Sequence, residues 1–70
     1  MNKALLRSFM IKYGDTQAVL AEAMGLSVSC LNAKINGKSD FLQNEIGFIK
    51  DRYHLTAYDV DSIFFAEKVS

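Results

Sequence analysis

The segment DTQAVLAEAMGLSVSCLNAKINGK, residues 15–38, decides the fold of this 70-residue chain. It holds two short amphipathic stretches, Gln17 to Met24 and Val28 to Asn36, and only Gly25-Leu26-Ser27 lies between them. Large apolar side chains recur four residues apart in each stretch, which places them on one face of a helix. A three-residue connection is too short for the two helices to pack antiparallel, so we expect them to cross at a steep angle.

Short-range signals mark the ends of both stretches. Thr16 or Asp15 can cap the first helix, because a side-chain oxygen there accepts from an early N–H group that lacks an intrahelical partner. Gly25 follows the last apolar position, where a left-handed backbone costs a residue without a Cβ almost nothing. Ser27 can cap the second helix. The inward-facing positions that we expect on the two helices and their turn are Leu20, Ala21, Met24, Leu26, Leu31 and Ile35.

Two helices that cross steeply after a short turn are typical of a helix-turn-helix, in which the second helix enters the major groove of DNA. The positions of the second helix that face outward carry short side chains, which suit a close approach to base edges. These positions are Val28, Ser29, Asn32 and, at the edge of reach, Ala33. The stretch therefore predicts a DNA-binding surface.

The same stretch resembles the phage repressor and Cro family of helix-turn-helix proteins. The resemblance covers these 24 residues closely and rests on Thr16-Gln17, Leu20-Ala21-Glu22, Met24-Gly25-Leu26-Ser27, Leu31 and Asn36-Gly37-Lys38. It implies an all-α fold, a compact five-helix lambda-repressor-like domain with the helix-turn-helix at the second and third helices. Residues 1–70 would then form a single DNA-binding domain.

The resemblance also implies roles for individual residues. The glutamine that opens the first helix of the motif, Gln17, would bind a phosphate and support the base-reading side chains. The bases would be read by Val28, Ser29, Asn32 and Ala33. The turn after the second helix would hold the phosphate backbone through Asn36, the Gly37 N–H group and Lys38.

Two positions depart from the family's pattern. Lys34 stands where many members carry an apolar residue, so we expect Ile35 to supply the packing there. Val28 often has a polar counterpart in the family, which leaves this chain fewer donors for direct readout of bases.

Three further helices are expected outside the motif. Asn2 can cap a helix from Lys3 to Tyr13, another helix runs from about Gln43 to Tyr53, and Thr56 with Asp59 forms a capping-box-like start for the last. Their apolar stripes are Leu5, Leu6, Phe9, Met10 and Tyr13, then Leu42, Ile46, Ile49 and Tyr53, then Val60, Ile63 and Phe64. We expect Phe41 to anchor the preceding loop in the core and Gly47 to mark a tight contact between helices.

The net charge is zero, but the charges are unevenly distributed. Residues 1–38 hold five bases and two acids, whereas residues 39–70 hold three bases and six acids. The half that carries the motif is thus the basic half, which favours a nucleic-acid partner, although ordinary solvated surface charges explain the same counts. Arg7, which with Lys3 lies opposite the apolar stripe of the first helix, is a candidate phosphate ligand outside the motif.

Length and composition limit the remaining possibilities. A domain of this size buries only about 60% of the surface that its unfolded chain exposes, so association with a partner would help to stabilise it. The single cysteine excludes an intramolecular disulfide and favours a reducing cytoplasm. The resemblance to phage repressors implies that this is the cytoplasm of a bacterial host. Apolar runs no longer than four residues predict neither a membrane span nor a secretory signal.

Enzymatic and metal chemistry have little support in the sequence. A nucleophile and its base would have to be Cys30 and His54, the only residues of their types, and no third group that would orient them is specified. A zinc site needs about four closely spaced ligands. The four glycines are scattered, so no phosphate-binding loop is present. We therefore expect no enzyme, no cofactor and no metal.

Two aromatic residues near the C-terminus, Phe64 and Phe65, cannot easily be buried on the same face of so small a domain. They would either form the interface of a homodimer or be covered by the C-terminal residues folding back over the core. We expect a sequence-specific transcriptional regulator, a Cro-like repressor that binds a palindromic operator as a dimer. The alternative is a helical protein-binding module such as an antitoxin or an antirepressor.

Overall fold

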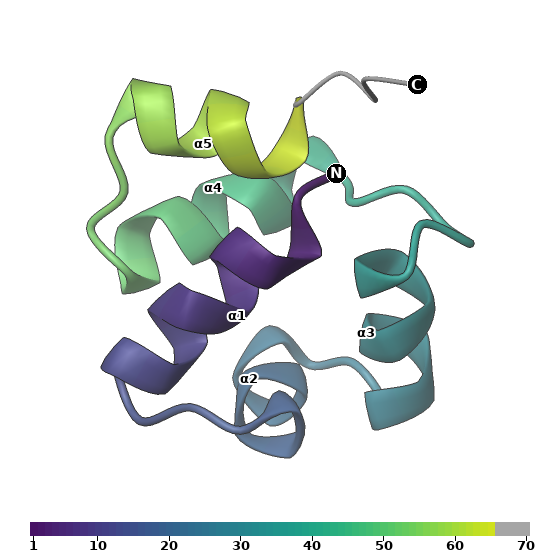
Figure 1. Cartoon of the computed structure of the whole chain (residues 1–70). Coiled ribbons are helices and arrows are strands. Elements are labelled where there is room, and N and C mark those ends of the chain that lie inside the picture. The colour runs from purple at the N-terminus through teal and green to yellow at the C-terminus, as the bar shows by residue number, and fades with distance from the viewer. Residues whose placement is uncertain (66–70) are drawn as a thin grey trace.

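Five helices make up the part of the chain that the computed structural model describes, residues 1–65 (Figure 1). They are α1 (Lys3–Lys12), α2 (Gln17–Met24), α3 (Val28–Ile35), α4 (Gln43–Arg52) and α5 (Ala57–Phe64), and no strand occurs in this range. The expected all-α fold with five helices is confirmed. Within residues 1–65 no single helix is long and apolar enough to cross a membrane, although α2 and α3 taken together as one bent pair pass the same test.

The helix ends follow the short-range signals in the sequence. Asn2, Thr16, Ser27 and Thr56 each accept a hydrogen bond from the N–H group three residues ahead, so Thr16, and not Asp15, caps α2. Asp59 completes the capping box by accepting from the Thr56 N–H group at 3.0 Å. Gly25 ends α2 in the left-handed region, with φ at 72°. These caps satisfy donors that a helix end would otherwise leave unpaired.

One apolar core lies among all five helices. Its buried members are Leu6, Met10, Leu20, Ala21, Leu31, Ile35, Ile49, Tyr53, Leu55 and Ile63. Half-buried apolar side chains surround them, namely Met1, Leu5, Phe9, Met24, Phe41, Val60 and Phe64. Phe41 anchors the α3–α4 loop as expected, whereas Leu55, in the turn before α5, was not anticipated as a core residue.

Three expectations about packing were wrong. Leu42 is the N-cap residue of α4 and is 58% exposed, because it precedes the helix and so does not lie on its apolar stripe. Tyr13 follows the end of α1 and is 42% exposed, with the centroid of its ring 5.3 Å from that of the Tyr53 ring. Gly47 marks no tight contact, since a Cβ added there would meet no atom within 4 Å.

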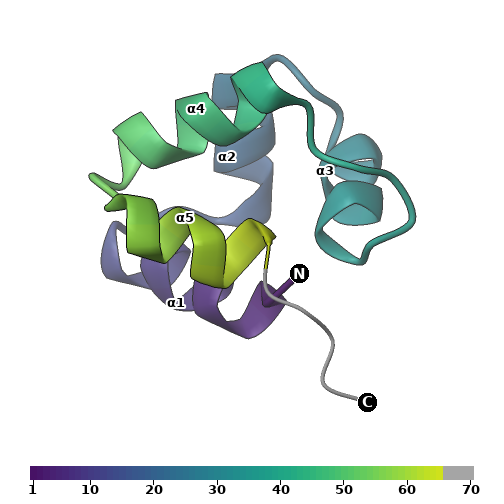
Figure 2. The same ribbon diagram turned by 90° about the horizontal axis from the view of Figure 1, so that it is seen from above.

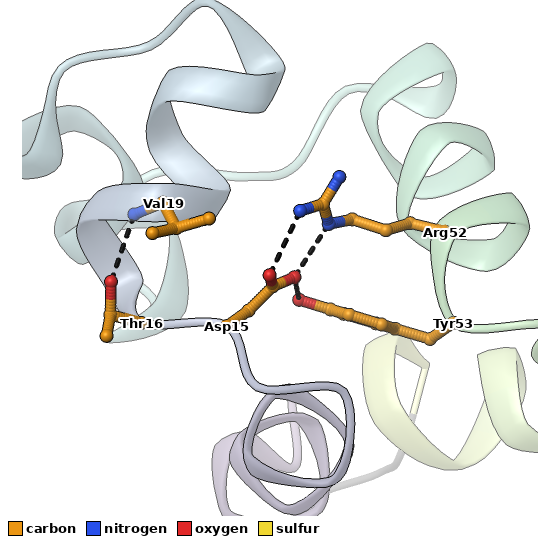
Figure 3. A network of polar contacts seen from close by, with 5 residues as sticks. All are labelled: Asp15, Thr16, Val19, Arg52 and Tyr53. Atoms are coloured by element: carbon orange, nitrogen blue, oxygen red, sulfur yellow. Dashed lines mark hydrogen bonds and ion pairs between the residues drawn. The ribbon is translucent and has the colours of Figure 1, made fainter.

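A buried carboxylate ties the α1–α2 turn to the end of α4 (Figure 3). Asp15 accepts from Arg52 Nε at 2.6 Å, from Arg52 Nη2 at 3.0 Å and from the Tyr53 hydroxyl at 2.7 Å. The Asp15 side chain is only 8% exposed. The hydrogen bond from Arg52 holds the pKa of Asp15 below its ordinary value despite its burial, and burial together with Asp15 raises the pKa of Tyr53.

Replacing Asp15 by asparagine tests this cluster. Asp15→Asn leaves the Arg52 guanidinium without its carboxylate, and we expect the free energy of unfolding at neutral pH to fall by about 2–3 kcal/mol. The Arg52 side chain is 31% exposed, so water compensates part of the loss. Urea titration followed by circular dichroism measures the change. Asp51→Asn removes a neighbouring exposed acid and should change stability by less than about 0.5 kcal/mol.

The same cluster sets the sign of a pH dependence. Folding lowers the pKa of Asp15 from 3.8. The Asp15 carboxylate therefore contributes its full stabilisation of the folded state above pH 3.8, and this contribution is lost as the pH falls through the lower folded-state pKa. The difference in stability between the wild type and Asp15→Asn should therefore shrink in acid. A difference that stays constant from neutral pH to pH 2, or an equal loss in Asp51→Asn, would contradict this assignment.

Candidate nucleic-acid interface

The geometry of α2 and α3 sets what the surface can contact. The chain turns by 106° between the two helices, and the break is Gly25-Leu26-Ser27. Leu20 and Ala21 of α2 and Leu31 of α3 are fully buried, so the inner faces of both helices belong to the core. In both views α3 lies at the edge of the molecule, which leaves one of its sides without a covering helix (Figures 1 and 2).

The uncovered side of α3 carries the residues expected to read bases. Val28 is 49% exposed, and Ser29 and Asn32 are exposed. Asn36, the C-cap residue, is also exposed and continues the line at a spacing of four residues. Ala33 is half-buried beside this line. The outer side of α3 is thus accessible along its whole length.

Hydrogen bonds join four side chains across this surface. Gln17 Nε2, at the start of α2, donates to Asn32 Oδ1 at 3.0 Å. Asn36 Nδ2 donates to the same oxygen at 3.1 Å. Lys3 Nζ, at the start of α1, donates to Asn36 Oδ1 at 3.3 Å. We call these four hydrogen-bonded side chains, the three amides of Asn36, Asn32 and Gln17 with Lys3 at one end, the amide chain. It brings together three of the expected DNA-contact residues and adds Lys3.

The turn after α3 places the remaining phosphate candidates. Gly37 is left-handed, with φ at 78°, and its N–H group donates to the Lys34 carbonyl oxygen at 3.2 Å. The Lys38 N–H group donates to the Ala33 carbonyl oxygen at 2.9 Å, and residue 38 is exposed. Arg7 is exposed on α1, one turn after Lys3. A phosphate at Gly37 would therefore share an N–H group that already has a partner.

A buried ion pair fixes the inner side of α3 against α4. Lys34 Nζ lies 2.8 Å from Glu45 Oε1 and 3.2 Å from the Asp40 carbonyl oxygen, and the two side chains are only 10% and 12% exposed. Ile35 supplies the apolar packing as expected, at 1% exposure. Burial raises the pKa of Glu45, but hydrogen bonds from Lys34 and from the Leu42 N–H group outweigh it and lower the pKa overall.

The two aromatic residues at the end of α5 have different environments. Phe64 is half-buried and packs edge-on against Phe41 at a centroid distance of 5.2 Å. Phe65 is 62% exposed. With Met1, Phe41 and Ile46 they border a hollow between the α3–α4 loop and α5. Residues 66–70, which were expected to fold back over this region in one of the two alternatives, lie outside the described residues.

The residues considered for other chemistry lie apart from this surface or form no cluster. Cys30 is a free, half-buried thiol on α3. His54 is exposed in the turn after α4, with φ at 51° and its ring 6.2 Å from that of Tyr13. Among residues 1–65 no group of three or more His, Cys, Asp or Glu side chains is placed to hold a metal ion.

Comparison with known proteins adds no relative. No family model, no curated protein and no solved structure matches this chain. The resemblance to phage repressors therefore rests on the residues of the segment 15–38.

The contribution of the Lys34–Glu45 ion pair to stability can be tested by substituting one partner and then both. Lys34→Met leaves the Glu45 carboxylate buried without a counter-charge, and we expect the free energy of unfolding to fall by about 2–3 kcal/mol in urea titrations. The double variant Lys34→Met with Glu45→Gln removes that charge and keeps a carbonyl oxygen for the Leu42 N–H group. It should recover a large part of the loss, and a double variant no more stable than the single one would argue against the pair.

Proposed function

We propose that this chain is a sequence-specific double-stranded DNA-binding transcriptional regulator, with α2 and α3 forming a helix-turn-helix and α3 entering the major groove. The observation that carries the proposal is the Gln17–Asn32 hydrogen bond on the uncovered side of α3. A residue at the start of α2 thereby supports a base-reading position on α3. The 106° turn between the helices supports the same proposal, since it falls within the range typical of this motif.

In this proposal each residue of the candidate interface has a chemical role. Val28 contacts a thymine methyl group, while Ser29 and Asn32 form hydrogen bonds with base edges and Ala33 lies at the edge of reach. The phosphates are held by Gln17, Asn36, Gly37, Lys38 and Arg7. Phosphate contacts set position and orientation, so sequence preference depends on the few base-reading side chains.

The regulator is proposed to bind as a homodimer. A palindromic operator with half-sites about 34–36 Å apart presents the same major-groove surface to each protomer. Phe65 provides exposed apolar area for the dimer contact, next to Phe64. A protein that occupies a promoter in this way represses by excluding polymerase. We place this activity in the cytoplasm of a bacterial host, as for a phage or prophage Cro-like repressor.

A second candidate function is favoured by the exposed phenyl ring of Phe65, since protein-binding surfaces are enriched in aromatic residues. The chain would then be a helical protein-binding module, such as an antitoxin or an antirepressor. Salt dependence separates the two functions. DNA binding weakens with a log-log slope of about −0.9 per neutralised phosphate, whereas an apolar protein contact shows little such dependence.

Two substitutions test the division of roles within the DNA interface. After selection of a preferred sequence from random duplexes, Asn32→Ala should lose about 1–3 kcal/mol of preference for that operator over random DNA. Lys38→Ala should weaken binding to both DNAs about equally and lower the salt slope by about 1. Fluorescence anisotropy at several salt concentrations measures both effects. Equal behaviour of the two variants would contradict the assigned roles, and no enriched sequence would contradict the function.

The dimer contact has its own test. Phe65→Ala should leave the monomer folded, because the ring is mostly exposed, but should abolish cooperative binding of two protomers to the operator. Tyr58→Ala is the matched control, since it removes an aromatic ring from α5 that is 79% exposed. Analytical ultracentrifugation at sub-saturating protein resolves duplexes that carry one protomer from those that carry two. Doubly occupied duplexes that predominate over singly occupied ones in Phe65→Ala, as cooperative binding requires, would exclude this contact.

A further inference from the structure

We propose that Lys3 determines which atom of the Asn32 side chain faces the DNA base, and that it makes Asn32 a hydrogen-bond donor that selects guanine. The inference rests on the function proposed above, because it concerns the base that Asn32 reads. Lys3 acts through the amide chain and touches no base. It is therefore a positioning residue located outside the α2–α3 motif, at the first position of α1.

The chemistry of the amide chain follows from its end at Lys3. A lysine ammonium group donates hydrogen bonds and accepts none. The atom of Asn36 that lies 3.3 Å from Lys3 Nζ must therefore be the oxygen Oδ1. Asn36 Nδ2 then points toward Asn32, 3.1 Å away, where it must meet the acceptor Oδ1. Gln17 meets the same oxygen at 3.0 Å and so must present Nε2.

These contacts leave Asn32 with only one kind of hydrogen-bonding group for DNA. An amide oxygen has two lone pairs, and those of Asn32 Oδ1 accept from Gln17 and Asn36. The exposed Asn32 side chain is therefore left with the two hydrogens on Nδ2. Guanine presents two adjacent acceptors, N7 and O6, in the major groove, whereas adenine presents one acceptor and one donor. A side chain limited to donation matches guanine.

Lys3 opposes the opposite orientation of these amides, in which the oxygen and the NH₂ group of each side chain exchange places. Turning the Asn32 amide alone would place its NH₂ group against the NH₂ groups of Gln17 and Asn36. Turning all three amides together would keep their mutual hydrogen bonds, but it would place the Asn36 NH₂ group against the Lys3 ammonium group. The three amides would otherwise be free to present either atom of Asn32, so Lys3 provides the bias toward donation.

The first experiment measures base preference. Selection from random duplexes is carried out with the wild type and with Asn32→Ala, and the position that loses its preference in Asn32→Ala identifies the base read by this residue. We expect guanine there, bound about 10-fold or more tightly than adenine in two duplexes that differ only at that base pair. Lys3→Met should bring this ratio close to one. Lys12→Met removes the same charge from the other end of α1 and should preserve the ratio.

A second variant reverses the amide chain. Asn36→Asp supplies acceptors only, so it can accept from Lys3 and also from Asn32 Nδ2, which turns Asn32 Oδ1 toward the base. The preferred base should then shift from guanine toward adenine, whose N6 amino group donates to that oxygen. The added negative charge weakens binding to both duplexes alike, so the affinity ratio is unaffected by it.

The outcomes distinguish this inference from the proposed function. An A·T pair instead of a G·C pair at the position read by wild-type Asn32, an unchanged ratio in Lys3→Met, or a G·C preference retained in Asn36→Asp would overturn the inference while leaving DNA binding intact. The proposed function fails in a different way. The wild type would then enrich no sequence. Enrichment of the same operator by Asn32→Ala would show that Asn32 reads no base, and it would overturn the inference while leaving DNA binding intact.

Discussion

Two charge pairs attach the α2–α3 pair to opposite ends of α4, and the position of the candidate interface depends on them. Arg52, at the end of α4, holds Asp15 just before α2, while Glu45, in its first turn, holds Lys34 on α3. Removing one partner leaves Asp15, Lys34 or Glu45 buried without its counter-charge, or leaves Arg52 partly compensated by water. The orientation of α3 is therefore set mainly from its inner side, while its outer side is linked to α1 and α2 only by exposed side-chain hydrogen bonds.

Much of the fold could be predicted because its signals are local. A cap such as Ser27 accepts from an N–H group only three residues away, and the left-handed Gly25 is required by the turn itself, so a short window of sequence contains the whole interaction. The partner of Asp15 lies 37 residues further along, and nothing local distinguishes Arg52 from other bases. Tyr13 and Leu42 were wrongly assigned to the core because the helical spacing of apolar residues was extended to residues just outside the helices. Tyr13 follows α1 and Leu42 precedes α4, so neither has the helical backbone that would place it on the apolar stripe.

The candidate site shows the same limit. The outward positions of α3 followed from helical periodicity, and the contact between Gln17 and Asn32 agrees with the role that the resemblance implies for this glutamine. The contribution of Lys3 could not be predicted, because it depends on how α1 lies against the C-terminal end of α3, 33 residues away along the chain. No pattern within α1 separates Lys3 from Arg7 or Lys12. Such contacts become visible only once the helices are placed in space.

The buried pairs also change how the charge distribution bears on DNA binding. Lys34 is neutralised by Glu45 and so is withheld from any phosphate, while Asp15 is neutralised by Arg52. The exposed charges of residues 1–38 are then four bases, Lys3, Arg7, Lys12 and Lys38, and one acid, Glu22. The basic surplus of this half thus remains on the surface, although the whole chain is neutral. In the proposed DNA complex so few bases would supply the nonspecific attraction that discrimination between sequences would have to come from the groups on α3. With one amide and one hydroxyl there, such an interface would depend strongly on which atom each of them presents.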